Sequence, residues 1–191
     1  AKWMVTVYRR DVQHVLQIRA LGANGDSNIV YRTVSLPDAG CVESLNARVE
    51  DDFFTFTFTN FTTPGIVHSF DLGELRTKCN DAGALRVIDR MKVAGLGSER
   101  YKTEQMFVSS ADGTRVPMFV VGKKKQSEDE VQTNRACLLY GYGGFMISLM
   151  PSFSATWALW IEQFDGVVAI ANLRGGDEYG EDWHNGGGLQ K

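Results

Sequence analysis

The sequence predicts an all-β half, residues 1–92, followed by an α/β half, residues 93–191. In the first half, short runs of alternating apolar and polar residues are separated by turn residues, which is typical of consecutive strands. Residues 93–100, VAGLGSER, have the composition of a linker. Beyond them, two apolar runs flank a stretch with helical spacing, and this order predicts a βαβ unit with a parallel sheet.

Composition and charge exclude several classes of protein. The 191 residues are 43% hydrophobic and carry a net charge of −3, so a globular chain without the basic surplus of a nucleic-acid binder is expected. No apolar run approaches the ~18–20 residues that cross a bilayer, so no membrane partner is expected. Cys41, Cys79 and Cys137 lie far apart without a CxxC pair, which argues against a disulfide framework or a zinc site.

The first half divides into seven expected strands. They are residues 3–10, 14–21, 28–36, 41–48, 52–60, 65–72 and 85–91. Within the fifth, Phe54, Phe56 and Phe58 alternate with threonine. Because side chains in a strand alternate between its two faces, the three phenylalanines are expected on one face.

A faint internal repeat favours a β-propeller for these strands. VLQIRAL (15–21) lies over IVHSFDL (66–72) with an offset of 51 residues. Four strands per ~40–50 residues is the period of a propeller blade. Residues 40–91 would then be one complete blade, residues 1–36 three strands of the preceding blade, and the rest of the ring would lie upstream. A plain antiparallel sandwich of short strands fits the same pattern.

The second half begins with a predicted hairpin and continues into the βαβ unit. The expected elements are strands 103–110 and 114–121, a strand at 136–142, a helix at 154–164 and a strand at 166–174. Asp112-Gly113 between the first two is a strong turn signal. Ser154 can cap the helix, whose Trp157 and Trp160 belong to a broad apolar face.

Residues 138–145, LLYGYGGF, are the first stretch that could carry chemistry. They follow a buried strand, and glycines there would let the backbone approach a reacting carbonyl closely. Tyr142 between the glycines offers a phenol that stays protonated at neutral pH and could donate to an oxyanion. The alternative is a tight turn without a chemical role. Phosphate binding is disfavoured because neither GxGxxG nor GxxxxGK[ST] is present.

Residues 171–188, ANLRGGDEYGEDWHNGGG, are the second such stretch. Its charged side chains fall within eleven positions and are Arg174, Asp177, Glu178, Glu181, Asp182 and His184. A carboxylate pair or an Asp–His relay is conceivable. A structural loop with a salt-bridged Arg174 is the favoured interpretation, because no nucleophile elbow accompanies His184.

Together these motifs resemble the prolyl oligopeptidase family of serine peptidases. LLYGYGGF is followed by a loop and helix and then by VVAIANLRGGDEYGEDWHNGG. TNFTTPGIVHSFDL (59–72) and SSADGTRVPMFVVGKK (109–124) extend the resemblance upstream. It implies a mixed fold, in which the end of an all-β propeller (1–92) is followed by the first part of an α/β-hydrolase peptidase domain (93–191). It also implies an active site between them.

The resemblance further implies cleavage of short proline-containing peptides after proline, in the cytoplasm, through an acyl-enzyme and without a metal or cofactor. Tyr142 matches the tyrosine whose hydroxyl helps to form the oxyanion hole. Phe145 matches an aromatic that lines the proline pocket, and Ile147 a neighbouring apolar contact. Arg174 to Gly176 match a turn beside the site, for which a structural role is expected.

No residue matches the family's serine, aspartate and histidine, and no GxSxG elbow occurs. These groups are expected downstream in the remainder of the same polypeptide, so the 191 residues alone are expected to be inactive. Two alternatives stay open at this point. One is a transpeptidase of the same type that cyclises peptides, and the other is a non-catalytic propeller module that only binds.

Overall fold

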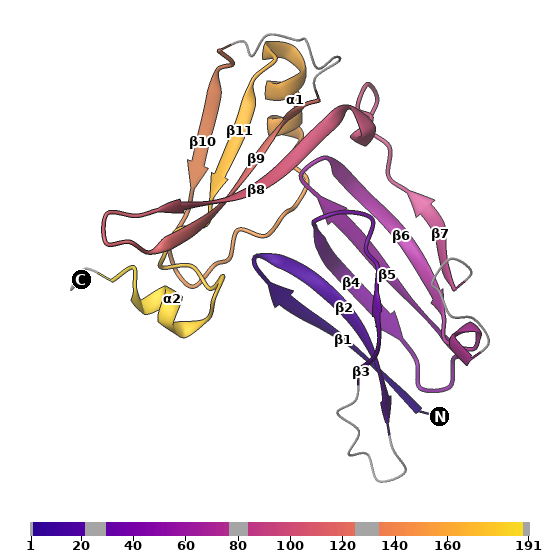
Figure 1. Cartoon of the computed structure of the whole chain (residues 1–191). Helices are drawn as coiled ribbons and strands as arrows, with labels where there is room; N and C mark the ends of the chain where they lie inside the picture. The colour runs from indigo at the N-terminus through magenta and orange to yellow at the C-terminus, as the bar shows by residue number, and fades with distance from the viewer. Residues whose placement is uncertain (1, 22–29, 77–83, 125–133, 189–191) are drawn as a thin grey trace.

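The computed structural model describes residues 2–21, 30–76, 84–124 and 134–188 and contains three β-sheets (Figure 1). The first sheet is antiparallel and consists of β1 (Lys2–Arg10), β2 (Gln13–Leu21) and β3 (Val30–Val34). The second is antiparallel and consists of β4 (Cys41–Ala47), β5 (Phe53–Asn60), β6 (Thr63–Asp71) and β7 (Leu85–Arg90). The seven strands predicted for this half are therefore present.

The phenylalanines of β5 form the centre of the core between these two sheets. Phe54, Phe56 and Phe58 are each at most 1% exposed, which confirms that they share one face. Phe54 stacks on Phe70 of β6, with ring centroids 5.3 Å apart. From the other sheet, β2 contributes apolar side chains to the same cluster. Alternation along β5 thus explains why the two sheets pack face to face.

The third sheet has the strand order β10-β11-β9-β8. Its strands are β8 (Tyr101–Ser109), β9 (Arg115–Lys123), β10 (Cys137–Gly141) and β11 (Val167–Ala171). β8 and β9 form the predicted hairpin, with Gly113 at φ +82° in its turn. The helix α1 (Ala155–Phe164) lies between β10 and β11 in the chain, and its Trp157 N–H donates to the Ser154 hydroxyl, as predicted.

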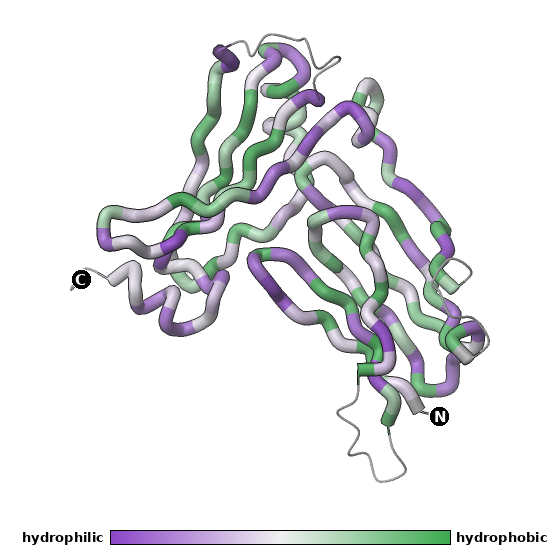
Figure 2. The backbone as a smooth tube through the Cα atoms, in the orientation of Figure 1, coloured by the Kyte–Doolittle hydropathy of each residue, from purple (hydrophilic) through white to green (hydrophobic). Residues whose placement is uncertain are grey.

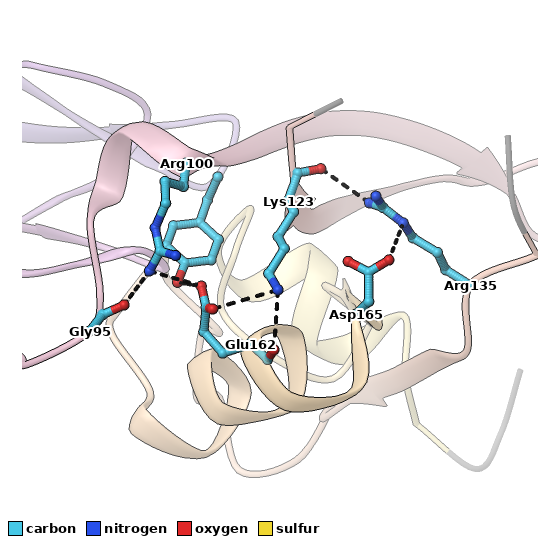
Figure 3. A network of polar contacts seen from close by, with 7 residues as sticks. Gly95, Arg100, Lys123, Arg135, Glu162 and Asp165 are labelled. Atoms are coloured by element: carbon cyan, nitrogen blue, oxygen red, sulfur yellow. Dashed lines mark hydrogen bonds and ion pairs between the residues drawn. The ribbon is translucent and has the colours of Figure 1, made fainter. Parts of the chain in front are cut away.

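A polar network fixes α1 to the third sheet (Figure 3). Glu162 accepts a hydrogen bond from the Tyr101 hydroxyl and pairs with Arg100 and Lys123 at 3.2 and 3.5 Å. The Tyr101 hydrogen bond and the two cations lower the pKa of Glu162. The carboxylate therefore stays ionised where it joins the helix to the start of β8 and the end of β9.

Two turns of the first two sheets enter the core of the third. Val12, in the β1–β2 turn, is fully buried there, and Phe61, in the β5–β6 turn, is 4% exposed. The Phe61 and Phe119 rings lie 5.2 Å apart by centroid. Figure 2 shows hydrophobic stretches along β9 and β11 of this sheet. The third sheet is thus packed directly onto the other two.

The prediction that residues 93–191 form the first part of an α/β-hydrolase domain is wrong. Among the residues that the structure describes, strands account for 50% and helices for only 12%, so this part of the chain is mostly β-sheet. In the third sheet β9 runs antiparallel to both neighbours, and β10–β11 is the single parallel pair among the described strands. One βαβ crossover forms as predicted, but it does not make a sheet layered with helices. The boundary at residues 92 and 93 stays a prediction.

Three features bear on the classes of protein considered above. Among the described residues, no helix has the length and apolar character needed to span a bilayer. No group of three or more metal-ligating side chains occurs in the same part of the chain. Cys41 is buried and Cys137 is exposed, both as free thiols, whereas Cys79 lies outside the described residues.

Candidate functional site

The two stretches singled out in the sequence lie side by side in the structure. Because β10 and β11 are parallel and neighbours, the segments that follow them leave the sheet at the same edge. We call residues 142–149 the tyrosine loop and residues 172–180 the arginine loop. Backbone contacts join them, since the Met146 N–H donates to the Gly175 carbonyl at 3.3 Å.

Glycines allow this contact between the loops. Gly175 has a φ of +100°, a conformation that other residues rarely adopt. A β-carbon there would overlap the Gly143 carbonyl oxygen, and one on Gly143 would overlap the Arg174 carbonyl oxygen. The tyrosine and arginine loops can therefore pack at this distance only with glycine at both positions.

The tyrosine loop contains the three residues predicted for the site. Tyr142 is half-buried, and its ring lies against Gly144, where a β-carbon would be 3.3 Å from the ring. Phe145 and Met146 both have a φ of 55°, and the Ile147 N–H donates to the Gly144 carbonyl at 3.1 Å. This is a tight turn with two left-handed residues, neither of which is glycine.

The turn presents its apolar side chains outward. Phe145 is 85% exposed and Ile147 is 51% exposed. Backbone held in a sparsely populated conformation often marks a functional segment. An exposed aromatic ring on such a turn is suited to contact an apolar ligand. The structure thus brings Tyr142, Phe145 and Ile147 into one short loop.

Buried polar groups anchor the far end of the tyrosine loop. Glu178 is 3% exposed, and its carboxylate accepts the Leu149 N–H at 3.0 Å. Asn172 is fully buried and donates to the Leu149 carbonyl at 2.8 Å. A buried carboxylate and amide that bind one residue from both sides restrict its position.

His184 has a structural contact rather than a relay. It lies in α2 (Glu181–Asn185), and its Nδ1 is 2.7 Å from the Gly175 carbonyl oxygen. The Gly175 N–H in turn donates to the Trp183 carbonyl at 3.0 Å. Helix α2 therefore braces the arginine loop, which agrees with the structural role favoured for this stretch.

Arg174 ties the arginine loop to the β8–β9 turn. Its guanidinium pairs with Asp112 and lies 3.3 Å from the Thr114 hydroxyl. The Thr114 backbone N–H, followed by Arg174, holds the pKa of Asp112 well below its usual range. The predicted salt bridge of Arg174 is thus present.

Three further residues that take part in these contacts were not predicted from the sequence. Asn172 is one of them, and Arg9 and Asp11 of the first sheet contact the loops from across the chain. Asn172 is the first residue of the arginine loop and directly follows the apolar run of β11, which could have marked it. Arg9 lies 139 and 168 residues from Ser148 and Asp177, Asp11 lies 168 residues from Tyr179, and no local pattern indicates such contacts.

Comparison with known proteins shows which proteins the chain is similar to. Residues 1–80 match the family model described as prolyl oligopeptidase, N-terminal beta-propeller domain. A prolyl endopeptidase of Elizabethkingia miricola is 36% identical over 162 residues, which are 85% of this chain and 21% of that protein. The chain is similar to prolyl oligopeptidases. The first two sheets therefore correspond to propeller strands rather than to a sandwich.

Other prolyl oligopeptidase relatives extend the match over nearly the whole chain. The dual function macrocyclase-peptidase POPB of Galerina marginata is 29% identical over 186 residues, 97% of this chain and 24% of that protein. The structure of prolyl oligopeptidase B from Galerina marginata, as apo protein, superimposes with a TM-score of 0.78 at 27% identity. It covers 97% of this chain, which in turn covers 24% of it. The chain spans about a quarter of the length of such relatives.

Proposed function

We propose that these residues act as part of a serine-type endopeptidase that cleaves short peptides after proline. The observation that carries the proposal is the 36% identity to a prolyl endopeptidase over 85% of the chain. The exposed, strained turn beside the glycine contact supports it, because it offers a donor and an apolar wall in one loop. The nucleophilic serine, its histidine and the aspartate would come from residues outside these 191.

In this proposal Tyr142 acts on the transition state. A serine, deprotonated by histidine, attacks the carbonyl carbon of the proline residue, and the carbonyl oxygen gains negative charge. The Tyr142 hydroxyl and a backbone N–H would donate to that oxygen. One such donor is worth about 2.7–4 kcal/mol of barrier in a serine protease. Collapse of the intermediate expels the amine and leaves an acyl-enzyme, which water hydrolyses.

Phe145 and Ile147 would select proline. The pyrrolidine ring is rigid, apolar and without an N–H, so an aromatic wall can cover it without leaving a donor unpaired. The left-handed backbone at Phe145 holds its ring away from the loop, where 85% of the residue is exposed. We expect short proline-containing peptides as substrates, no metal or cofactor, and a cytoplasmic setting in which Cys41 and Cys137 stay reduced.

The experiment uses the full-length polypeptide that contains these residues. It should hydrolyse a chromogenic peptide with proline before the scissile bond, and the same peptide with alanine much more slowly. Prior treatment with a fluorophosphonate should abolish hydrolysis, whereas a metal chelator should not. Peptide binding without hydrolysis would refute the proposal and favour a non-catalytic propeller module.

A second candidate is a macrocyclase of the same type. The similarity to a dual function macrocyclase-peptidase of Galerina marginata favours it. The chemistry differs only in whether water or the amine of the same peptide captures the acyl-enzyme. Mass spectrometry of products from a longer proline-containing peptide distinguishes them, because a cyclic product is 18 Da lighter than the linear acid.

A further inference from the structure

The β1–β2 turn has an unusual backbone for its sequence. Arg10 pairs with Gln13 across the hairpin, so Asp11 and Val12 alone form the connection. Their φ angles are 46° and 61°. Two-residue hairpin turns of this kind favour asparagine and glycine, whereas a β-branched residue at positive φ is an outlier. The contacts that this turn makes must offset its strain.

Those contacts lie on the third sheet and the arginine loop. Val12 is fully buried in the core around Phe119. The Asp11 carbonyl accepts a hydrogen bond from Gln105 at 2.7 Å, and its carboxylate accepts one from the Tyr179 hydroxyl at 3.1 Å. These contacts fix the β1–β2 hairpin against the third sheet and the arginine loop.

Arg9, just before this turn, contacts both loops of the site. Its Nη1 donates to the Ser148 hydroxyl at 2.8 Å, and its Nη2 donates to the Asp177 carboxylate at 2.9 Å. Ser148 directly follows Ile147, and Asp177 directly follows Gly176. A guanidinium presents its donors in a rigid, planar fork, so this contact fixes the distance between the two loops.

We propose that Arg9 is a positioning residue, which holds the tyrosine loop against the arginine loop and so sets the placement of Phe145 and Ile147 toward substrate. This proposal rests on the proposed function. At its far end the tyrosine loop is anchored by Glu178 and Asn172 through Leu149. Arg9 is the anchor supplied by the propeller side of the chain. Through Arg9, the β1–β2 turn affects substrate selection by the tyrosine loop, whose Ser148 lies 139 residues further along the chain.

The competing interpretation is an ordinary surface ion pair. The Arg9 and Asp177 side chains are 30% and 33% exposed, and exposed pairs contribute little to stability. Arg10 provides the matched comparison, because it is an adjacent, exposed arginine that belongs to the same hairpin. Replacing either arginine by methionine removes one positive charge, but only one replacement releases the loops.

The experiment compares Arg9→Met, Arg9→Lys and Arg10→Met in the full-length polypeptide. Hydrogen exchange of the peptide covering residues 144–150 should be about 3–30-fold faster in Arg9→Met than in wild type, and unchanged in Arg10→Met. For the proline substrate, KM should rise about 3–10-fold with kcat nearly unchanged, because substrate placement rather than chemistry is affected. Arg9→Lys should lie between them, since an ammonium cannot reproduce the fork.

Equal exchange and equal KM in Arg9→Met and Arg10→Met would overturn the proposal. If Arg9→Met fails to fold, Ser148→Ala takes its place, because it removes one partner and leaves the Asp177 pair. It should raise exchange in the same peptide to a smaller extent, and no increase would again overturn the proposal. Absence of cleavage after proline in the wild type refutes the proposed function instead, and the exchange measurement still decides the role of Arg9.

Discussion

The carbonyl oxygen of Gly143 occupies the space that a side chain on Gly175 would need. This contact joins the segments after β10 and β11, and the Gly175 carbonyl in turn accepts the Met146 N–H. The turn that presents Phe145 is therefore built on a contact between two glycines. Its geometry depends on two positions that have no side chain of their own.

Gly175→Ala should destabilise the protein and disturb the tyrosine loop. Alanine at a φ of +100° pays a backbone cost of about 1–2 kcal/mol, and its methyl group also overlaps the Gly143 carbonyl. Gly113→Ala is the control, because Gly113 has a φ of +82° with open space around it. Urea unfolding gives the free energy of unfolding of each variant. Gly175→Ala should lose more than Gly113→Ala, because only Gly175→Ala adds the steric overlap. An equal loss in the two variants would show that the overlap has no effect on stability.

Tyr142→Phe should lower kcat about 10–1000-fold and leave KM nearly unchanged. The substitution keeps the ring against Gly144 and removes only the hydroxyl, which is proposed to act on the transition state. Steady-state kinetics with a proline substrate measures both constants. An unchanged kcat, with normal folding by circular dichroism, would remove Tyr142 from the catalytic assignment.

Phe145→Ala should reduce the preference for proline over alanine at the cleaved position. The loss of an apolar wall is worth about 1–3 kcal/mol of discrimination, so the ratio of kcat/KM values should fall about 10–200-fold. Met146→Ala is the matched control, since Met146 has the same φ of 55° in the same turn. A proline preference that survives Phe145→Ala, or that falls equally in both variants, contradicts the assignment.

Stability should fall as pH drops below about 6.5, partly because of His68. This side chain is 2% exposed and stacks on Phe56, with ring centroids 4.9 Å apart. Burial lowers the pKa of His68. The folded state thus disfavours the proton that the unfolded chain accepts, so stability is complete above the unfolded pKa and is lost as pH falls toward the folded one.

His68→Phe tests this dependence. Phenylalanine keeps an aromatic ring beside Phe56 and cannot be protonated. Urea midpoints at pH 7 and pH 5 should differ less in the variant than in wild type. An identical pH dependence in the two proteins would show that His68 does not contribute to it.

Strand alternation and helix capping could be predicted from the sequence, because both depend on residues close together in the chain. Alternation placed Phe54, Phe56 and Phe58 on one buried face, because the period of a strand is fixed by its backbone. The capping hydroxyl of Ser154 marked the start of α1, since a helix leaves its first N–H groups unpaired. The tyrosine and arginine loops were recognised because each follows a strand, but their mutual contact could not be predicted from either one.

Two errors had physical causes. One βαβ crossover at β10 and β11 was extended to a whole α/β domain, although the hairpin β8–β9 supplies half of that sheet. The break between the strands at 3–10 and 14–21 was predicted, but the two-residue turn with positive φ angles was not, because Asp11-Val12 lacks the glycine or asparagine that marks such turns. Tertiary contacts across the chain compensate for this turn, and no window of neighbouring residues contains that information.

The burial of Val12 and Phe61 beneath the third sheet has a consequence for any attempt to divide the protein. A cut at the glycine-containing segment 93–100 would separate the chain where its composition changes, but it would leave these two apolar side chains in water on one piece. The other piece would retain a hole lined by Phe119 and Ile161. We therefore expect melting of the intact chain to pass through a single cooperative transition, which either fragment would lose.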